Sequence, residues 1–350
     1  MNNLKTNNKN LKEDKTIIKT YNKKECNQLR FYAPTINNQR WLMKKIKCFI
    51  IGLGNISVGY DKDIKKKDVF YTHAKSIEAN KSLELIGGTD RSQNKRKRFF
   101  KIYKKPTYKD IVKPLSTLKP SMVILSTPTN THLSCVKEIA LHNCVKFLIC
   151  EKPLSYKIQE AKKIVEICKK NKIKLFINYF RISDPSTQKL KKIFINEKNI
   201  TGTVFYSRGF FNNSSHFFNL FEYIFGKFIN GYTINKVKRY NKYDFSCNFN
   251  TRFNKAQILF KCKNNQFDKF NIDLNSENNS IKYLNNGKKI ILTNKNKISK
   301  EIKNLSYKYQ MNVYDEFIKY ISKKKYNLCT GKEALKTTNN MYKVLNSEKF

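Results

Sequence analysis

The chain has 350 residues, of which 40% are hydrophobic, so it can supply a core for each of two domains and is not a disordered protein. Its formal net charge of +45 comes overwhelmingly from lysine, which is spread along the whole sequence together with abundant asparagine and isoleucine. Because a nucleic-acid-binding surface gathers its cations on one face, this even spread argues against specific nucleic-acid binding as the main role.

The nine cysteines form no Cys-x-x-Cys pair and have no histidine at zinc-like spacing, so no metal site is expected. Cys48 and Cys150 lie in apolar runs, where a reduced thiol packs as a small hydrophobe. No stretch is long and apolar enough for a membrane helix, and no signal-peptide core follows Met1. We therefore expect a soluble protein of the reducing cytoplasm, without membrane insertion.

Residues 1–42 are rich in asparagine and lysine and carry only scattered apolar side chains. Such a segment cannot bury enough surface to offset the entropy of ordering, so it is predicted to be a disordered, dispensable tail. Met43 immediately precedes the first apolar run, and the sequence leaves open whether translation starts at Met1 or Met43.

Residues 43–180 alternate between apolar runs and amphipathic stretches, which predicts a Rossmann-type parallel sheet with helices on both faces. The strands are predicted at 46–51, 83–88, 122–126, 145–150 and 174–178. The helices are predicted near His73 and at 92–102, 132–143 and 155–171. In the last helix Ala161, Ile164, Val165 and Cys168 recur at helical spacing and define one buried face.

Residues 181–306 have a different pattern, which predicts an α+β substrate and oligomerisation domain with a mainly antiparallel open sheet. Helices are predicted at 186–197 and 216–225, a strand at 202–209, and several strands without intervening helices thereafter. Asn286-Gly287 suits a tight hairpin turn because both positions tolerate positive φ. We expect the chain to form a homo-oligomer through this sheet.

Residues 307–350 are predicted to form two closing helices that pack back on the first domain. Val313, Phe317 and Ile321 form an apolar stripe on the first of them. Thr330 and Glu333 have the spacing of a capping box at the start of the second.

A glycine-rich turn, Gly52-Leu53-Gly54, follows the first predicted strand. Such a turn lets backbone amides approach a pyrophosphate, and Ser57 stands where a third glycine is usual. Asp90 ends the second strand, where an acid can accept hydrogen bonds from an adenosine ribose. A chance glycine turn is the alternative, which the surrounding alternation disfavours. Further cofactor contacts are expected from Asn55, Ile56 and Arg91.

The choice between NAD and NADP depends on two neighbouring residues. Asp90 would repel a 2′-phosphate, which favours NAD. Arg91 could turn to pair with that phosphate, which leaves NADP possible.

Two more polar segments follow predicted strands, and ligands of open parallel sheets bind beyond the carboxyl ends of the strands. The first is Ser126-Thr127-Pro128 with Asn130 and His132, although Thr131 or Asn130 could simply cap the next helix. The second is Glu151-Lys152-Pro153. Both are predicted to contact the cofactor.

These motifs, in this order over about residues 43–350, resemble the Gfo/Idh/MocA family, the relatives of glucose–fructose oxidoreductase and inositol 2-dehydrogenase. The motifs that carry the resemblance are Gly52-x-Gly54, Asp90, Ser126-Thr127-Pro128 with His132, Glu151-Lys152-Pro153, Asn178-Tyr179-Phe180-Arg181 with Pro185, and His216. The resemblance implies that Lys152 lies between nicotinamide and substrate, with a cis peptide before Pro153. It also implies that His216 is the acid/base catalyst, in a substrate site that includes Tyr179, Arg181, Asn212 and Asn219.

One departure affects the expected chemistry: the family has carboxylates where this chain has Asn212 and Asn219. His216 opens an apolar helix, whose dipole favours the neutral imidazole that a general base needs. We therefore expect an NAD(P)-dependent oxidoreductase acting on a secondary alcohol of a sugar, nucleotide sugar or cyclitol. The alternative is a non-catalytic dinucleotide- or sugar-binding member that acts as a sensor or assembly partner.

Overall fold

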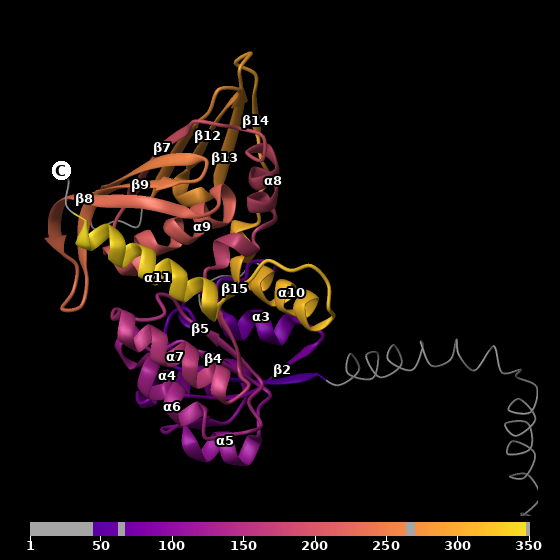
Figure 1. The fold of residues 1–350 in the computed structure, drawn as a ribbon. Helices are drawn as coiled ribbons and strands as arrows, with labels where there is room; N and C mark the ends of the chain where they lie inside the picture. The colour runs from indigo at the N-terminus through magenta and orange to yellow at the C-terminus, as the bar shows by residue number, and fades with distance from the viewer. Residues whose placement is uncertain (1–44, 62–66, 264–269, 348–350) are drawn as a thin grey trace, which may run out of the picture. The chain divides into compact units, whose positions relative to one another are not determined.

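The computed structural model describes residues 45–61, 67–263 and 270–347, and a compact unit begins at Ile46 (Figure 1). The predictions of a disordered tail over 1–42 and of a start at Met43 lie outside the described residues.

The first sheet has seven strands in the order β15-β6-β5-β4-β1-β2-β3. Its strands are β1 (Ile46–Ile51), β2 (Leu83–Thr89), β3 (Thr107–Tyr108), β4 (Met122–Leu125), β5 (Phe147–Cys150), β6 (Lys174–Ile177) and β15 (Cys329–Thr330). All neighbours pair in parallel except β15, which runs antiparallel to β6. The predicted Rossmann sheet is confirmed.

The central strands are continuous apolar runs because both faces of this sheet are buried. Phe49, Val123 and Leu148 belong to one core cluster, whereas the next residues along the same strands, Ile50, Ile124 and Ile149, belong to the other. The helices that cover the sheet are α3 (His73–Ala79), α4 (Gln93–Tyr103), α5 (Val112–Leu118), α6 (His132–Ile139) and α7 (Ile158–Lys170).

The second sheet has eight strands in the order β14-β13-β12-β11-β7-β10-β9-β8. Its strands are β7 (Ile200–Tyr206), β8 (Phe228–Arg239), β9 (Phe245–Phe253), β10 (Ala256–Cys262), β11 (Asn271–Asn275), β12 (Asn279–Leu284), β13 (Lys289–Asn294) and β14 (Ser299–Glu301). Only β7 and β10 pair in parallel, so the predicted, mainly antiparallel sheet is confirmed.

Several predicted boundaries in this half were wrong by a few residues. The strand predicted at 202–209 is β7 and ends at Tyr206, because Arg208 and Gly209 adopt φ of 63° and 88° and leave the extended region. The helix predicted at 186–197 is α8 (Pro185–Ile193), and the one at 216–225 is α9 (Ser215–Phe225). The Asn286-Gly287 hairpin is confirmed, with φ of 60° and 79° at the two residues.

The two predicted closing helices are α10 (Tyr309–Ile321) and α11 (Gly331–Asn346). Thr330 and Glu333 form the predicted capping box of α11. In Figure 1, α10 lies beside α3 of the Rossmann half, and α11 runs from that half to the second sheet, in agreement with its contacts to α7 and β8.

Candidate active site

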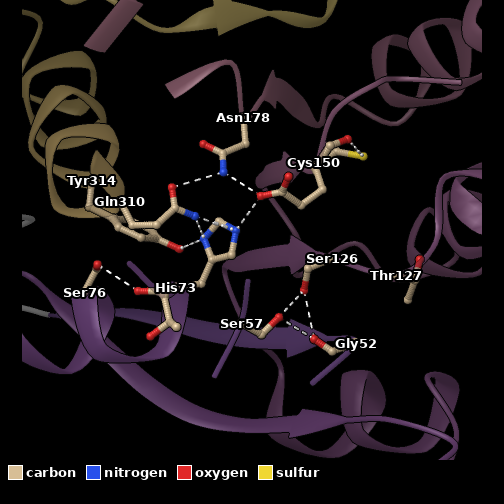
Figure 2. A network of polar contacts seen from close by, with 12 residues as sticks. Gly52, Ser57, His73, Ser76, Ser126, Thr127, Cys150, Asn178, Gln310 and Tyr314 are labelled. Carbon is tan, nitrogen blue, oxygen red and sulfur yellow. Dashed lines mark hydrogen bonds and ion pairs between the residues drawn. The ribbon is translucent and has the colours of Figure 1, made fainter. Parts of the chain in front are cut away.

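The glycine turn after β1 is closed against the end of β4. Gly52 has φ of 94°, and a Cβ there would lie 2.7 Å from the Ser126 carbonyl oxygen, so only glycine fits. Ser57 Oγ donates to the Gly52 carbonyl oxygen over 2.6 Å and lies 2.6 Å from Ser126 Oγ (Figure 2). A Cβ on Gly54 would meet nothing within 4 Å. The turn is thus fixed on its inner side and open at Gly54.

Asp90, which directly follows β2, holds the same turn through a hydrogen bond. Its carboxylate accepts from the backbone N–H of Leu53 and that of Ser92, both over 2.9 Å. Lys95 Nζ lies 3.6 Å from Asp90 Oδ2. The predicted cofactor contacts Asn55 and Arg91 are exposed beside this turn, and Ile56 is partly exposed.

The residues of the predicted segment after β4 differ in exposure. Pro128 and Asn130 are exposed, whereas Thr127 is half-buried and lies 2.8 Å from the hydroxyl of Thr131. Thr131 makes no side-chain cap of α6, so the capping alternative is wrong for this residue.

His132 was predicted to contact the cofactor, but its side chain is wholly buried. Its Nδ1 lies 3.1 Å from the Leu154 carbonyl oxygen, and its Nε2 lies 3.2 Å from the Thr127 carbonyl oxygen. Burial lowers its pKa. His132 therefore joins the turn after β4 to the segment that follows β5, and it reaches a ligand only through the backbone it supports.

Glu151 directly follows β5 and belongs to a buried polar network, of which Figure 2 labels His73, Asn178, Gln310 and Tyr314. Its Oε1 lies 3.0 Å from His73 Nε2 and accepts from Asn178 Nδ2 over 2.5 Å. Gln310 and Tyr314 of α10 continue the network, with Tyr314 Oη 2.8 Å from His73 Nδ1 and Gln310 Oε1 accepting from Asn178 over 3.1 Å. Burial alone would raise the pKa of Glu151, but the bonds from His73 and Asn178 and the charge of Lys152 lower it.

Lys152 connects the first sheet to the second half of the chain. The Lys152–Pro153 peptide is cis, as the resemblance implied. Lys152 Nζ donates to the Asn212 carbonyl oxygen over 2.6 Å and lies 3.4 Å from Asn212 Oδ1. Burial, against the opposing charge of Glu151 and together with the charge of Arg181, lowers the pKa of Lys152 to about 8.

His216 lies in the first turn of α9, directly after a π-helical turn, Phe210–Ser214, that carries Asn212. Only 5% of it is exposed, and its ring packs edge-on against Phe180 and Tyr179, with ring centres 4.8 and 5.7 Å away. Burial, Lys152 and Arg181 lower its pKa well below the ordinary value. His216 is therefore neutral near pH 7 and able to accept a proton.

The two asparagines at the family's carboxylate positions have different surroundings. Asn212 accepts hydrogen bonds from Lys152 Nζ. Asn219 donates to Thr337 Oγ1 over 3.1 Å and to Cys329 Sγ over 3.5 Å, and among the described residues no hydrogen bond joins it to His216. The side-chain amide of Asn219, predicted to belong to the substrate site, thus binds β15 and α11.

Sequence reasoning missed a carboxylate near this site. Asp244 is buried and accepts from the backbone N–H groups of Phe211, Asn212 and Phe245 over 2.8–3.1 Å. Burial raises its pKa to about 6. It stands in the β8–β9 connection, far from Asn212 in sequence, and no local motif marks it.

The predicted substrate residues Tyr179 and Arg181 follow β6. Tyr179 is 2% exposed, which leaves little of it for direct contact with a substrate. Arg181 lies against aromatic rings beside His216. Within the described ranges, no group of three or more His, Cys, Asp or Glu side chains could hold a metal ion. No helix in those ranges has the length and apolar character that a bilayer crossing needs.

Comparisons with known proteins agree with this geometry. Residues 46–179 match the family GFO_IDH_MocA, described as an oxidoreductase family with an NAD-binding Rossmann fold, which confirms the predicted nicotinamide dinucleotide domain. A curated relative, the rhizopine catabolism protein MocA of Rhizobium meliloti, is 33% identical over 69 residues, which are 20% of this chain and 21% of the relative. The match thus spans about a fifth of the relative's length.

Solved structures share the fold over most of the chain. The WlbA dehydrogenase from Bordetella pertussis, in complex with NADH and UDP-GlcNAcA, has a TM-score of 0.66 at 16% identity, covering 86% of this chain and 94% of that one. The transcriptional regulator Gal80p from Kluyveromyces lactis has a TM-score of 0.67 at 13% identity, covering 86% and 89%. At these identities the likeness concerns the fold alone.

Proposed function

Because residues 46–179 match the Gfo/Idh/MocA oxidoreductase family, we propose that the chain is an NAD(P)-dependent oxidoreductase acting on a secondary alcohol, or the corresponding ketone, of a sugar, nucleotide sugar or cyclitol. The observation that carries the proposal is the pairing of Lys152 and His216. Lys152 follows the Rossmann strand β5, and its Nζ donates to Asn212 in the turn that leads directly into α9 and His216.

The residues at the glycine turn fit a dinucleotide. Gly54 leaves open space where a side chain would stand, and Gly52 cannot be replaced without a clash with Ser126. Asp90 lies at the end of the neighbouring strand, where a ribose hydroxyl can donate to a carboxylate. Together these residues form a backbone-lined cradle at the carboxyl ends of β1 and β2, beside β4.

In the proposed mechanism Lys152 donates a hydrogen bond to the reacting oxygen and stabilises the negative charge that develops there. His216 accepts the proton of the hydroxyl group, or returns it in the reverse reaction. The nicotinamide, when bound, supplies hydride-transfer chemistry. The cationic Lys152 and Arg181 disfavour a protonated His216, so substrate charge or solvent must compensate once His216 takes the proton.

The test is hydride transfer with NAD and NADP across a panel of sugars, nucleotide sugars and cyclitols, followed by the absorbance of the reduced nicotinamide. We expect turnover with at least one panel member and a loss of roughly a hundredfold in His216→Ala. His142→Ala, which removes a partly buried histidine of the Rossmann half just after α6, is the matched control and should keep full activity. Equal activity in His216→Ala and His142→Ala would remove His216 from the mechanism.

A second function, a non-catalytic sensor of dinucleotide or sugar, is favoured by the asparagines at positions 212 and 219. Gal80p, a transcriptional regulator of the same fold, illustrates that class. Tight cofactor binding without hydride transfer on any panel member would favour this function over the enzyme.

We also propose that the chain forms a homo-oligomer through the open face of the second sheet. Light scattering after size-exclusion chromatography measures the mass directly, and a monomer across the micromolar range would contradict the proposal.

A further inference from the structure

The guanidinium of Arg181 has no polar partner among the residues that the structure describes. Arg181 forms no hydrogen bond or ion pair through its side chain with any residue of the described part of the chain, and its Nε is buried and unpaired. The nearby Asp184 instead accepts from the backbone N–H of Ser186 over 2.8 Å and from that of Leu305 over 3.1 Å. Burying a charge without a compensating partner costs free energy, so we expect the guanidinium of Arg181 to bind an anion.

Aromatic rings hold the guanidinium in place. Its central carbon lies 5.2 Å from the ring centre of Phe180, 4.8 Å from that of Phe217 and 4.3 Å from that of Phe270. Cation–π attraction at these distances offsets part of the cost of removing the charge from water. Burial lowers the pKa of Arg181 to about 10, so the group stays charged near neutral pH. The rings fix its position and leave its N–H groups for a ligand.

Two more buried polar groups beside Arg181 are unpaired. Tyr283 on β12 is 6% exposed, and its hydroxyl has no partner within the described residues. His216 Nδ1 is likewise buried without a partner. Arg181 and His216 both lie against the ring of Phe180, 5.2 Å and 4.8 Å from its centre. Arg181 also lies over the ring of Phe270, and the rings of Phe270 and Tyr283 both approach Gly287. Polar groups from β12, α9 and the segment after β6, unpaired within the described residues, thus lie around the same aromatic rings.

We propose that Arg181 and Tyr283 form a subsite for an oxyanion of the substrate, a carboxylate or a phosphate, next to the carbon that reacts between Lys152 and His216. A guanidinium presents two parallel N–H groups that match the two oxygens of such an anion, and a phenol adds a third donor. The inference rests on the proposed function and narrows its substrate class to acidic sugars and sugar phosphates or nucleotides.

The subsite also gives the reaction an electrostatic advantage. Lys152, Arg181 and Arg208 bring positive charge to one site, and the charges of Arg181 and Arg208 oppose protonation of Lys152. A bound oxyanion relieves this repulsion and keeps Lys152 protonated, the form that can donate to the reacting oxygen. Neutral substrates lack this effect.

The test measures binding rather than turnover, so that it can succeed even if no hydride transfer is found. Isothermal titration calorimetry of the NAD-saturated protein uses glucose, glucuronate, UDP-glucose and UDP-glucuronate as probes. We expect at least one oxyanion-bearing probe to bind roughly ten- to a hundredfold more tightly than glucose, and Arg181→Met to remove that preference while NAD affinity is kept. A preference shared by glucuronate identifies the carboxylate, and one confined to the UDP sugars identifies the phosphate.

Arg252→Met, which removes an exposed arginine of β9, is the matched control and should leave the preference intact. Tyr283→Phe should weaken it several-fold. Without ligand, Arg181→Met should melt at the same or a higher temperature, because it removes a buried unpaired charge. An unchanged preference in Arg181→Met would overturn the subsite.

One further variant tests whether a carboxylate of the chain itself pairs with Arg181 in place of a ligand. The carboxylate is that of Asp268, two positions before Phe270 in the sequence. Asp268→Asn should leave the affinities unchanged. A clear gain in oxyanion affinity in Asp268→Asn, together with destabilised Arg181→Met, would show that the chain itself supplies the anion and would refute the proposal.

Discussion

The cofactor half and the substrate half of the site differ in how their polar groups are satisfied. Around the glycine turn and Glu151, hydrogen bonds within the chain hold the side chains of Ser57, Ser126 and His73. Among the described side chains of that network, only Asn178 is left with an unpaired atom, its amide oxygen Oδ1. Across Lys152, by contrast, His216 Nδ1, Arg181 Nε and the Tyr283 hydroxyl are buried and have no partner among the described residues.

The difference shows which part of the site is complete before a ligand arrives. A satisfied network fixes geometry and adds stability, whereas buried unpaired donors cost stability unless a ligand meets them. The cofactor half is therefore organised by the fold, and the substrate half is expected to gain order and stability from its ligand.

Lys152 lies at the junction of the two halves, and its removal should have the largest effect. Lys152→Met keeps most of the volume but loses the charge and the donors. We expect turnover to fall by roughly two to three orders of magnitude, about 2.7–4 kcal/mol, with NAD affinity nearly unchanged. Single-turnover hydride transfer and calorimetry measure the two quantities. Lys157→Met, an exposed lysine nearby, is the control, and near-normal transfer in Lys152→Met would reject the mechanism.

Removing His73 tests the hydrogen-bond network around Glu151 in the cofactor half. His73→Leu removes the bond to Glu151 and leaves that carboxylate and the Tyr314 hydroxyl short of a partner. We expect the free energy of unfolding to fall by about 1–3 kcal/mol, measured by urea denaturation. In the double variant with Glu151→Gln the loss should be smaller, because a neutral amide needs less compensation. A fully additive cycle would mean that His73 and Glu151 do not interact.

The pH dependence should come from Lys152 rather than His216. Lys152 must be protonated to donate, and its pKa is about 8, so kcat/KM should be highest below pH 8 and fall about tenfold per pH unit above it. His216 has a pKa well below 6.5, so it stays neutral and adds no decline near that pH. Lys152→Arg should move the alkaline decline upward in whatever activity remains. A wild-type rate that still rises beyond pH 9 would contradict the assignment.

The smallest expected effect concerns the choice of dinucleotide. Asp90 should favour NAD over NADP by roughly five- to tenfold in affinity, because its carboxylate repels a 2′-phosphate. Calorimetry with both cofactors measures the ratio, and Asp90→Ser should reduce it. Tighter binding of NADP to the wild type, abolished in Arg91→Met, would show instead that the exposed Arg91 sets the preference.

The strands and helices with a clear local hydrophobic pattern could be predicted from the sequence. Strands buried on both faces are continuous apolar runs, so β1, β4 and β5 were predicted, and so were the polar residues that end them. The two-residue strands β3 and β15 are too short to show a period. Helix α5 was missed because Pro114 interrupts its pattern and only Pro114 and Leu115 are buried.

The residues that complete the site were not predictable in this way. Gln310, Tyr314, Asp244 and Tyr283 lie far in sequence from the side chains that they accompany, and each stands in an ordinary amphipathic or turn segment. The wholly buried position of His132 also depends on tertiary packing, since its motif alone predicted a ligand contact.

The pairing of β15 with β6 has a consequence for how the protein is made. Cys329 pairs with Ile177, so an edge of the first sheet stays open until β15 has left the ribosome. Gln310 and Tyr314, which complete the network around Glu151, arrive equally late. We therefore expect a nascent chain that ends before residue 300 to expose a sticky strand edge and to need chaperones, although every residue of the glycine turn has already been synthesised.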